Sequence, residues 1–307
     1  MINSNKPHSS YKDATGTMDF GLTNDYMFHA VFQKNKTALI GLIGSVIHMR
    51  PEEIKSVIIT NPIKIGEQMD EKSFVLDIEV LLNNDRVLNL EMQMENQHNW
   101  QDRSLSYLCR SFDQLYQGEQ YVNAKPVTHI GFLNFSPFPE TPEFYASYRL
   151  LNIKNHTTYS DKLTLSVIDL KHIELATEED KAYKIDYWAR LFTATTWEEL
   201  KMIADKDIYL EAATQSMYEL SSDELVQRQC RARRDYYKQI NSHNKTIREF
   251  EEAQQKLQET QTELQETQTE LQETQTELQE AQTELQEAQT EIERLQKYIE
   301  NLEKQQN

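Results

Sequence analysis

Two acidic side chains in a predicted β-hairpin are the first sign of chemistry in this chain. The stretch "VLDIEVLLNNDRVLNLEMQMEN" covers residues 75–96 and carries Asp77 in its first half and Glu91 in its second. A turn centred on Asn84 places Asp77 directly opposite Glu91. Directly opposed residues have Cβ atoms about 4.5–5.5 Å apart, and like charges there repel each other unless a cation lies between them.

A divalent cation would explain this pairing. Mg²⁺ is bound typically by one or two carboxylates and keeps several of its water molecules. A site formed by Asp77 and Glu91 therefore leaves room for a phosphate group and an attacking water, with Mn²⁺ as the alternative ion. The competing interpretation is structural, because a hairpin with one buried face carries polar residues on its solvated face.

The alternation of side chains predicts which face of the hairpin is buried. Apolar side chains share one face of each strand: Phe74, Leu76, Ile78, Val80 and Leu82, then Leu88, Leu90, Met92 and Met94. Polar side chains share the other face: Asp77 and Glu79, then Asn89, Glu91 and Gln93. The same register pairs Leu82 with Arg86 and Val75 with Gln93, unless a one-residue bulge shifts it.

A predicted helix, "WQDRSLSYLCRSFDQLYQG", follows the hairpin. Its apolar stripe is closed by Gly118 and consists of Leu105, Leu108, Cys109, Phe112, Leu115 and Tyr116. Arg103, Tyr107 and Arg110 lie at positions i, i+4 and i+7, where they could bind phosphate near the carboxylates. A solvated helix face with a half-buried tyrosine is the alternative.

The remaining apolar segments predict the elements that must position this site. "NDYMFHAVF" predicts a helix capped by Thr23 or Asn24, and "KTALIGLIGSVIH" predicts a second helix that ends before Pro51. The runs "KPVTHIGFLNF" and "KLTLSVIDL" predict strands that are buried on both faces. Residues 178–250 predict helices, with expected core contacts at Trp188, Leu191, Phe192, Trp197 and Leu200. This order indicates an α/β sandwich with a mixed sheet.

Several of these segments together resemble a known family. "KSFVLDIEV", "LNLEMQMEN", "DRSLSYLCRSFDQLYQGEQY" and "KPVTHIGFLNF", with the opening "LTNDYMFHAVF", are similar to the Rpn family of recombination-promoting nucleases, which are PD-(D/E)XK nuclease family transposases. The resemblance runs from about residue 18 to residue 240. It implies a restriction-endonuclease-like (PD-(D/E)XK) core, with a mixed sheet flanked by helices, that cuts DNA with Mg²⁺.

The resemblance also implies roles for single residues. Asp77 and Glu91 would bind the metal ion, and Asp25 would match an additional acidic position of the family. Gln93 would lie where the wider superfamily has a lysine, although glutamine is usual in this family. A neutral amide can orient water but supplies no positive charge, so Gln93 leaves the rate and the metal stoichiometry open.

Charge and composition limit the expected partners. The chain has a net charge of −18, and residues 251–307 hold 15 Glu against 4 Lys plus Arg, which leaves −7 for residues 1–250. A mildly acidic body does not attract nucleic acid at long range, so a DNA contact needs a local basic patch or a bound cation. The sequence shows no apolar stretch of membrane-spanning length and no secretory leader, which favours a cytoplasmic protein with no membrane contact.

Other side chains give weaker signals. Cys109 and Cys230 are far apart in helical patterns and are expected to be inert thiols. His129 and His172 lie in or just after strand patterns and are interpreted as structural histidines rather than metal ligands. A basic cluster near the end of the body could contact the DNA backbone or form a solvated helix face: Arg228, Arg231, Arg233, Arg234 and Lys238.

The C-terminal segment is a heptad repeat, with "LQETQTE" three times and "LQEAQTE" twice from Leu257 onward. Position a is Leu257, Leu264, Leu271, Leu278, Leu285, Ile292 and Ile299, and position d is Thr260, Thr267, Thr274, Ala281, Ala288, Leu295 and Leu302. This pattern predicts a parallel homo-oligomeric coiled coil about 75 Å long, anchored by its last two heptads because Thr and Ala bury little. A long single helix without a partner is the alternative.

These predictions combine into four segments and one leading function. The segments are a disordered lead-in at 1–17, a nuclease-like core at 18–175, a helical region at 176–250 and a coiled coil at 251–307. The expected function is that of a Mg²⁺-dependent endonuclease that hydrolyses DNA and is linked to recombination or mobile elements. One alternative is a catalytically weak or inactive domain that acts as a coiled-coil interaction protein. Another is an RNA hydrolase, because the same metal chemistry acts on either backbone.

Overall fold

The computed structural model describes residues 10–63, 77–115 and 117–306. Contacts between residues divide the chain into two units, Met1–Gln239 and Ile240–Asn307. The predictions for Phe74, Val75, Leu76 and Tyr116, including the pairing of Val75 with Gln93, lie outside the described residues. The four-segment division of the chain stays a prediction.

Six strands of the described chain form one mixed sheet in the first unit, in the order β1-β2-β3-β4-β6-β5. Their bounds are Val57–Ile59 for β1, Ile78–Leu82 for β2, Arg86–Gln93 for β3, Val127–Leu133 for β4, Tyr145–Leu151 for β5 and Thr158–Asp169 for β6. β3, β4 and β6 are parallel, and the outer pairs are antiparallel. The predicted mixed sheet is therefore confirmed.

The hairpin of β2 and β3 has the predicted register. Leu82 pairs with Arg86 and Ile78 with Leu90, and all five described pairs keep this register. Asn83 and Asn84 form the turn with φ angles of 49° and 62°, a left-handed conformation that asparagine tolerates. Asp77 directly precedes β2 and lies outside the five pairs, so its predicted position opposite Glu91 stays an extrapolation of this register.

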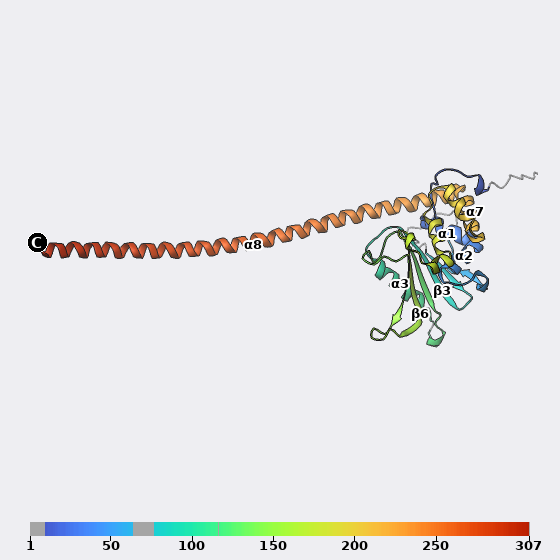
Figure 1. Ribbon diagram of the computed structural model, residues 1–307, viewed down its shortest axis with the longest axis horizontal. Helices are drawn as coiled ribbons and strands as arrows, with labels where there is room; N and C mark the ends of the chain where they lie inside the picture. The colour runs from blue at the N-terminus through green and yellow to red at the C-terminus, as the bar shows by residue number, and fades with distance from the viewer. Residues whose placement is uncertain (1–9, 64–76, 116, 307) are drawn as a thin grey trace, which may run out of the picture. The chain divides into compact units, whose positions relative to one another are not determined.

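Helices cover both faces of the sheet (Figure 1). On one face, apolar side chains of β2, β3, β4 and β6 share a core with α1 (Asp25–Lys34), α2 (Lys36–Val46), α5 (Ile185–Thr193) and α7 (Ile208–Ser221). On the other face, α3 (Trp100–Phe112) packs on β3, β4 and β6. Every residue of β4 is buried, which confirms the strand predicted from "KPVTHIGFLNF".

The α3 stripe predicted from the sequence is partly right: Leu108 is buried and Phe112 packs on its cluster, but the remaining described positions differ. The helix ends at Phe112, before Leu115 and Gly118, and its buried residues are Trp100, Ser104, Leu108 and Ser111. Leu105 is 51 % exposed, and Cys109 is exposed. The reason is a close contact at the first turn of the helix, where a Cβ on Gly131 would lie 2.3 Å from the Trp100 ring. Only glycine permits this contact, which places the start of α3 beside β4.

The capping residues that start α1 and α2 fit the sequence. Asn24 caps α1, as predicted, by accepting a hydrogen bond from the Met27 backbone. Its amide also donates to the Cys230 carbonyl, at 3.0 Å, in the helix α8 (Glu224–Gln306). Asn35 caps α2 in the same way. The first turn of α1, and with it Asp25, is thereby fixed to the first turns of α8.

The predicted helical region and its core contacts are confirmed. It contains α4 (Glu178–Ala182), α5, α6 (Trp197–Ala204), α7 and the start of α8. The five predicted core residues are all buried: Trp188, Leu191, Phe192, Trp197 and Leu200. Four short 3₁₀ helices are also described: Tyr11–Asp13, Pro51–Glu53, Tyr121–Asn123 and Ile173–Leu175.

Part of the expected disordered lead-in is ordered, which corrects that prediction for residues 10–17. Tyr11 is 2 % exposed, and Thr17 forms a β-bridge with Thr196. The Tyr11 hydroxyl donates to Glu211 of α7. An aromatic anchor in a polar stretch is what ties this segment to the body.

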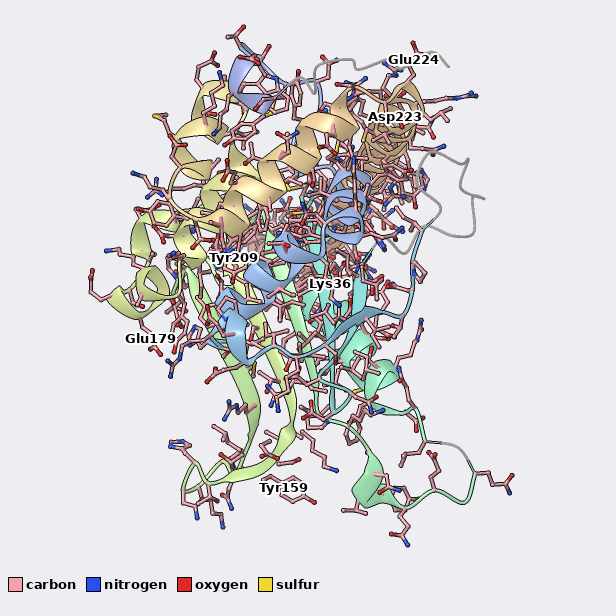
Figure 2. All side chains as sticks on the ribbon, turned by 90° about the vertical axis from the view of Figure 1, so that its right-hand side faces the viewer. Lys36, Tyr159, Glu179, Tyr209, Asp223 and Glu224 are labelled. Carbon is pink, nitrogen blue, oxygen red and sulfur yellow. The ribbon has the colours of Figure 1, made fainter. Side chains whose placement is uncertain are left out.

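Sequence reasoning missed the two edge strands, β1 and β5. β5 pairs with β6 in an antiparallel hairpin whose register shifts after Arg149. Tyr159, near its turn, is 86 % exposed and lies far from Tyr209 of α7 (Figure 2). Edge strands bury few side chains, so their hydrophobic pattern is weak.

The second unit is helical from Ile240 to Gln306. Leucines at position a from Leu257 to Leu285 are 57–60 % exposed. The Thr260 hydroxyl donates to the Lys256 carbonyl at 2.9 Å, and the threonines of the following repeats do the same. Of the helices described, none combines the length and the apolar character needed to span a membrane.

Candidate metal and phosphate site

A small pocket beside the end of β3 brings most of the predicted site residues together. Its lining residues are Asp25, Asp77, Glu91, Met92, Gln93, Arg103, Arg233 and Tyr237. Its volume is about 10 Å³, roughly that of a single water-sized sphere. The side chains come from α1, the start of β2, β3, α3 and the first turns of α8. Of the residues predicted from the sequence, Tyr107 and Arg110 are not in the lining.

Glu91 is a buried carboxylate in the middle of the sheet, 3 % exposed. Burial raises its pKa to about 7, against the lowering effect of Arg103 and with a further rise from Asp77. Arg103 Nη2 lies 2.8 Å from Oε1, and His129 Nε2 lies 3.5 Å from Oε2. The structural alternative of a solvated polar face is wrong for β3, because α3 covers that face.

Asp77 is the second carboxylate of the hairpin. Burial raises its pKa, and a hydrogen bond from the Asn89 side chain lowers it. Its Oδ1 is buried and has no hydrogen-bond partner among the described residues. The Asn61 amide holds this part of the chain, since it donates to the Asp77 carbonyl at 2.8 Å and accepts from the Glu79 backbone at 2.8 Å.

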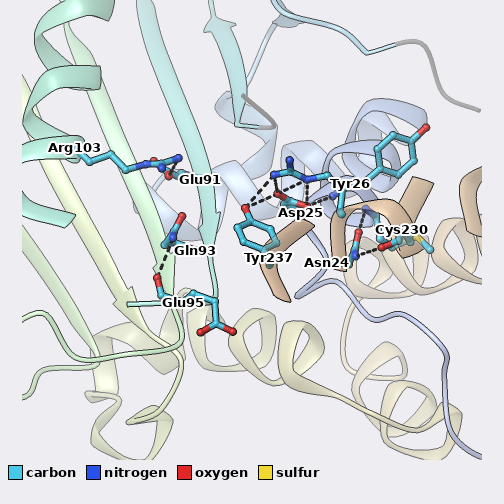
Figure 3. Close-up of polar contacts among 11 residues, drawn as sticks. Asn24, Asp25, Tyr26, Glu91, Gln93, Glu95, Arg103, Cys230 and Tyr237 are labelled. Carbon is cyan, nitrogen blue, oxygen red and sulfur yellow. Dashed lines mark hydrogen bonds and ion pairs between the residues drawn. The ribbon is translucent and has the colours of Figure 1, made fainter. Parts of the chain in front are cut away.

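Asp25 is paired with a side chain of α8 (Figure 3). Arg233 Nε is 3.1 Å from each carboxylate oxygen, and Nη2 forms a second contact with Oδ2. The Tyr237 hydroxyl donates to Oδ2 at 2.8 Å. Burial, followed by the charge of Asp25, raises the pKa of Tyr237. The negative charge of Asp25 is therefore compensated within the protein.

Gln93 lies at the end of β3 and is 4 % exposed. Its Nε2 donates to the Glu95 carbonyl at 3.0 Å (Figure 3). This bond fixes the orientation of the amide, and the amide oxygen is then the atom that could accept a hydrogen bond from water.

The three α3 residues form a stack, but only Arg103 reaches the pocket. The guanidinium carbons of Arg103 and Arg110 lie 5.2 Å and 5.9 Å from the centroid of the Tyr107 ring. Burial raises the pKa of Tyr107, and Arg103 lowers it. Arg110 is exposed. The stack therefore places Arg103 beside Glu91 and Arg110 at the surface.

The two histidines differ. His172 Nδ1 donates to Asp169 Oδ2 at 2.8 Å and lies 3.0 Å from Ser136 Oγ, as expected for a structural histidine. His129 is fully buried between the rings of Trp100 and Tyr107. Burial, followed by the charge of Arg103, lowers its pKa to about 3, so the ring is neutral. It contacts Glu91 but does not line the pocket.

The basic cluster is divided between the site and the surface. Arg233 is 4 % exposed and lines the pocket. The other members are exposed: Arg228, Arg231, Arg234 and Lys238. Sequence reasoning did not single out Tyr237 or Asn89 as site residues. The spacing of Arg233 and Tyr237 at i and i+4 was the available signal, since such residues share one helix face.

The donor atoms of the pocket fit a small divalent cation. Asp77 and Glu91 offer only oxygen ligands, which Mg²⁺ and Mn²⁺ prefer. The buried, unpartnered Oδ1 of Asp77 is an atom that such an ion would satisfy. Within the described ranges, no group of three or more His, Cys, Asp or Glu residues is arranged to hold a metal ion. The fit therefore rests on two carboxylates supplemented by water.

Comparison with known proteins gives one match. The model of a family described as PD-(D/E)XK nuclease family transposase matches residues 22–249. No curated protein and no solved structure matches the chain. The matched range includes every residue that lines the pocket.

Proposed function

The chain belongs to the PD-(D/E)XK nuclease family transposases, and from this premise we propose that it is a metal-dependent DNA endonuclease. The main support is the pair Asp77 and Glu91, which share one pocket in the register that the hairpin dictates. A buried carboxylate beside a half-buried one is costly in a protein interior, and such pairs are retained typically where function requires them.

Each residue of the pocket would have a separate role in phosphodiester hydrolysis. Asp77 and Glu91 would bind Mg²⁺ or Mn²⁺, and a bound ion supplies Lewis-acid stabilisation and an acidified water at such a site. Asn89 and Asn61 orient Asp77 and its backbone. Gln93 would position water through its amide oxygen, and Arg103 would contact the phosphate.

Exposed cations on α3 and α8 would bind the DNA backbone. Arg110 on α3 and four residues of the basic cluster are exposed: Arg228, Arg231, Arg234 and Lys238. Arginine and lysine contacts to phosphates supply affinity that falls as salt rises. Such local contacts would offset the acidic net charge of the chain. Membership of a nuclease transposase family is consistent with the cytoplasmic location and the role in recombination or mobile elements expected from the sequence.

The repeat unit would join copies of the chain. The exposed leucines at position a form an apolar seam, and the threonine hydroxyls at position d already donate within their own helix. In a parallel coil, glutamates such as Glu263 at position g face glutamines such as Gln261 at position e, whereas an antiparallel coil would oppose glutamates. We therefore propose a parallel homo-oligomer, whose paired sites could cut two antiparallel strands.

A nicking assay tests the proposed activity. Supercoiled DNA and a matched RNA would be incubated with the full chain and Mg²⁺, Mn²⁺ or Ca²⁺. We expect DNA cleavage with Mg²⁺ or Mn²⁺ and its loss in Asp77→Asn and Glu91→Gln. Glu79→Gln is the matched control, since Glu79 lies on β2 outside the pocket and bonds to Thr60. Equal cutting by the parent and Asp77→Asn would refute the assigned site.

An interaction protein with weak or no catalysis is the second candidate. The observations that favour it are the neutral Gln93, the two arginines that already neutralise Asp25 and Glu91, and the small pocket volume. If this candidate is correct, the chain should cleave neither DNA nor RNA with any of the metal ions, and it should still associate with itself. Preferential cleavage of the RNA would instead favour the third candidate, an RNA hydrolase.

A further inference from the structure

We propose that Arg103 neutralises Glu91 in the metal-free protein and releases it when Glu91 binds a divalent cation, so that the guanidinium turns to the DNA phosphate. This inference rests on the proposed function and extends it. It assigns Arg103 two successive partners, and it identifies the side chain that competes with the metal ion for its ligand.

The two arginines of the pocket are held very differently. Arg233 is 4 % exposed, and its Nε and Nη2 both bind Asp25. It also lies 5.1 Å and 4.9 Å from the ring centroids of Tyr236 and Tyr237. Such a bidentate, buried pair has a fixed geometry. Asp25 and Arg233 are therefore expected to stay together.

Arg103 has a looser attachment. Its side chain is 32 % exposed, and among the described residues its ion pair is one contact, from Nη2 to Glu91 Oε1 at 2.8 Å. Its Nε is buried without a hydrogen-bond partner among the described residues. A guanidinium with one charged contact and access to solvent can leave its partner at a lower cost than Arg233 could leave Asp25.

Glu91 cannot keep Arg103 and also bind a cation through the same oxygen. A metal ion beside Glu91 and Asp77 would lie close to the guanidinium, and the two positive charges would repel each other. Arg103 lines the same pocket as Glu91 and Asp77, so its positive charge opposes a cation at either carboxylate. Arg103 therefore competes with a cation for the whole pair.

Once released from Glu91, the Arg103 guanidinium could stabilise negative charge on the DNA phosphate. Gln93 supplies no positive charge, although charge develops on the phosphate oxygens during hydrolysis. Arg103 packs on the Tyr107 ring, next to the exposed Arg110, and can change partner by rotation of its own side chain. Arg103 on α3 would then supply the positive charge that Gln93 on β3 does not.

Metal binding by full-length variants tests the exchange without measuring cleavage. Mn²⁺ would be titrated into the parent, Arg103→Gln and the control Arg149→Gln, with free Mn²⁺ followed by electron paramagnetic resonance. We expect Arg103→Gln to bind Mn²⁺ roughly tenfold more tightly, because one charge-assisted contact no longer competes. Arg149→Gln, an exposed change on β5 outside the pocket, should match the parent. Equal or weaker Mn²⁺ binding by Arg103→Gln overturns the proposal.

A second measurement tests the phosphate partner. A short DNA duplex would be titrated with and without Ca²⁺, and we expect Arg103→Gln to lose affinity only in the presence of Ca²⁺. An equal loss in both conditions would make Arg103 a constant DNA contact and would also overturn the exchange. Glu91→Gln separates this outcome from failure of the proposed function: if that variant binds Mn²⁺ as the parent does, the metal site itself is wrong.

Discussion

Glu91 is 3 % exposed and has an arginine 2.8 Å away, whereas the glutamates of the repeat helix are exposed. The same side chain therefore has two physical roles in one protein. In the pocket each charge needs a specific partner, because an unpaired buried charge is expensive. In the repeats water solvates each charge, and no single glutamate matters much. Substitutions should have large, pH-dependent effects in the first region and small, additive effects in the second.

The largest effect is expected for Arg233→Met, which leaves the buried Asp25 without its cation. Loss of one partner of a buried ion pair costs about 3–5 kcal/mol. Urea unfolding should show this loss, while Arg228→Met, an exposed change in the same helix, should be within about 0.5 kcal/mol of the parent. The double variant Asp25→Asn/Arg233→Met should recover part of the stability. No recovery would mean that packing, rather than charge, explains the burial of Arg233.

Glu91→Gln should change how the stability of the protein depends on pH, which glutamates of the exposed repeats should not do. Burial raises the pKa of Glu91 from 4.5 to about 7, so the folded protein binds a proton that the unfolded chain releases. The stability of the parent should therefore fall as pH rises from about 4.5 to 7 and stay lower above that range. Glu91→Gln has no such group, and its stability relative to the parent should rise over this window by at most about 3 kcal/mol. Thermal unfolding at pH 5 and pH 8, with Glu79→Gln as control, measures the difference.

Gly131→Ala tests how the fold positions Arg103. A methyl group at this position would meet the Trp100 ring at 2.3 Å and push the start of α3 away from β4. Overpacking of this kind costs about 1–3 kcal/mol. We expect lower stability in urea unfolding and a shift of tryptophan fluorescence. Trp100→Leu should relieve the clash, so the two changes should be strongly non-additive; simple additivity would contradict the packing argument.

The smallest effects are expected in the repeats. Glu259 and Glu263 are like charges at i and i+4, and each such pair costs about 0.2–0.5 kcal/mol. Mild acidification protonates carboxylates and should raise the helical circular dichroism of the full chain and its self-association. Glutamine in place of these glutamates should give a similar gain at neutral pH. A signal that stays flat or falls on acidification would contradict the predicted coiled coil.

The part of the site that could be predicted from the sequence is the part that a local pattern encodes. Alternation and a three-residue turn define the hairpin register, and Asp77 and Glu91, at its open end, line one pocket. A contact with a distant segment has no such signature. Arg233 is 208 residues from Asp25 in the chain, and within "QRQCRARRDYYKQ" it looks like its exposed neighbours.

The same limit explains the error in α3. Helical spacing favoured the stripe with Leu105 and Cys109, but the buried face follows from the contact of Trp100 with Gly131. That contact depends on a glycine in another element. The α/β class and the mixed sheet were predictable because continuous apolar runs mark buried strands. The edge strands were not, because half of their surface is solvated.

The exposed repeats have a consequence for how this protein can vary. Each seven-residue unit adds about 10.5 Å of helix and leaves the phase of the leucine seam unchanged. Gain or loss of a whole unit therefore exposes no buried group and disturbs no contact of Asp25 or Glu91. The reach of this helix can thus change by whole units while the pocket is left unchanged.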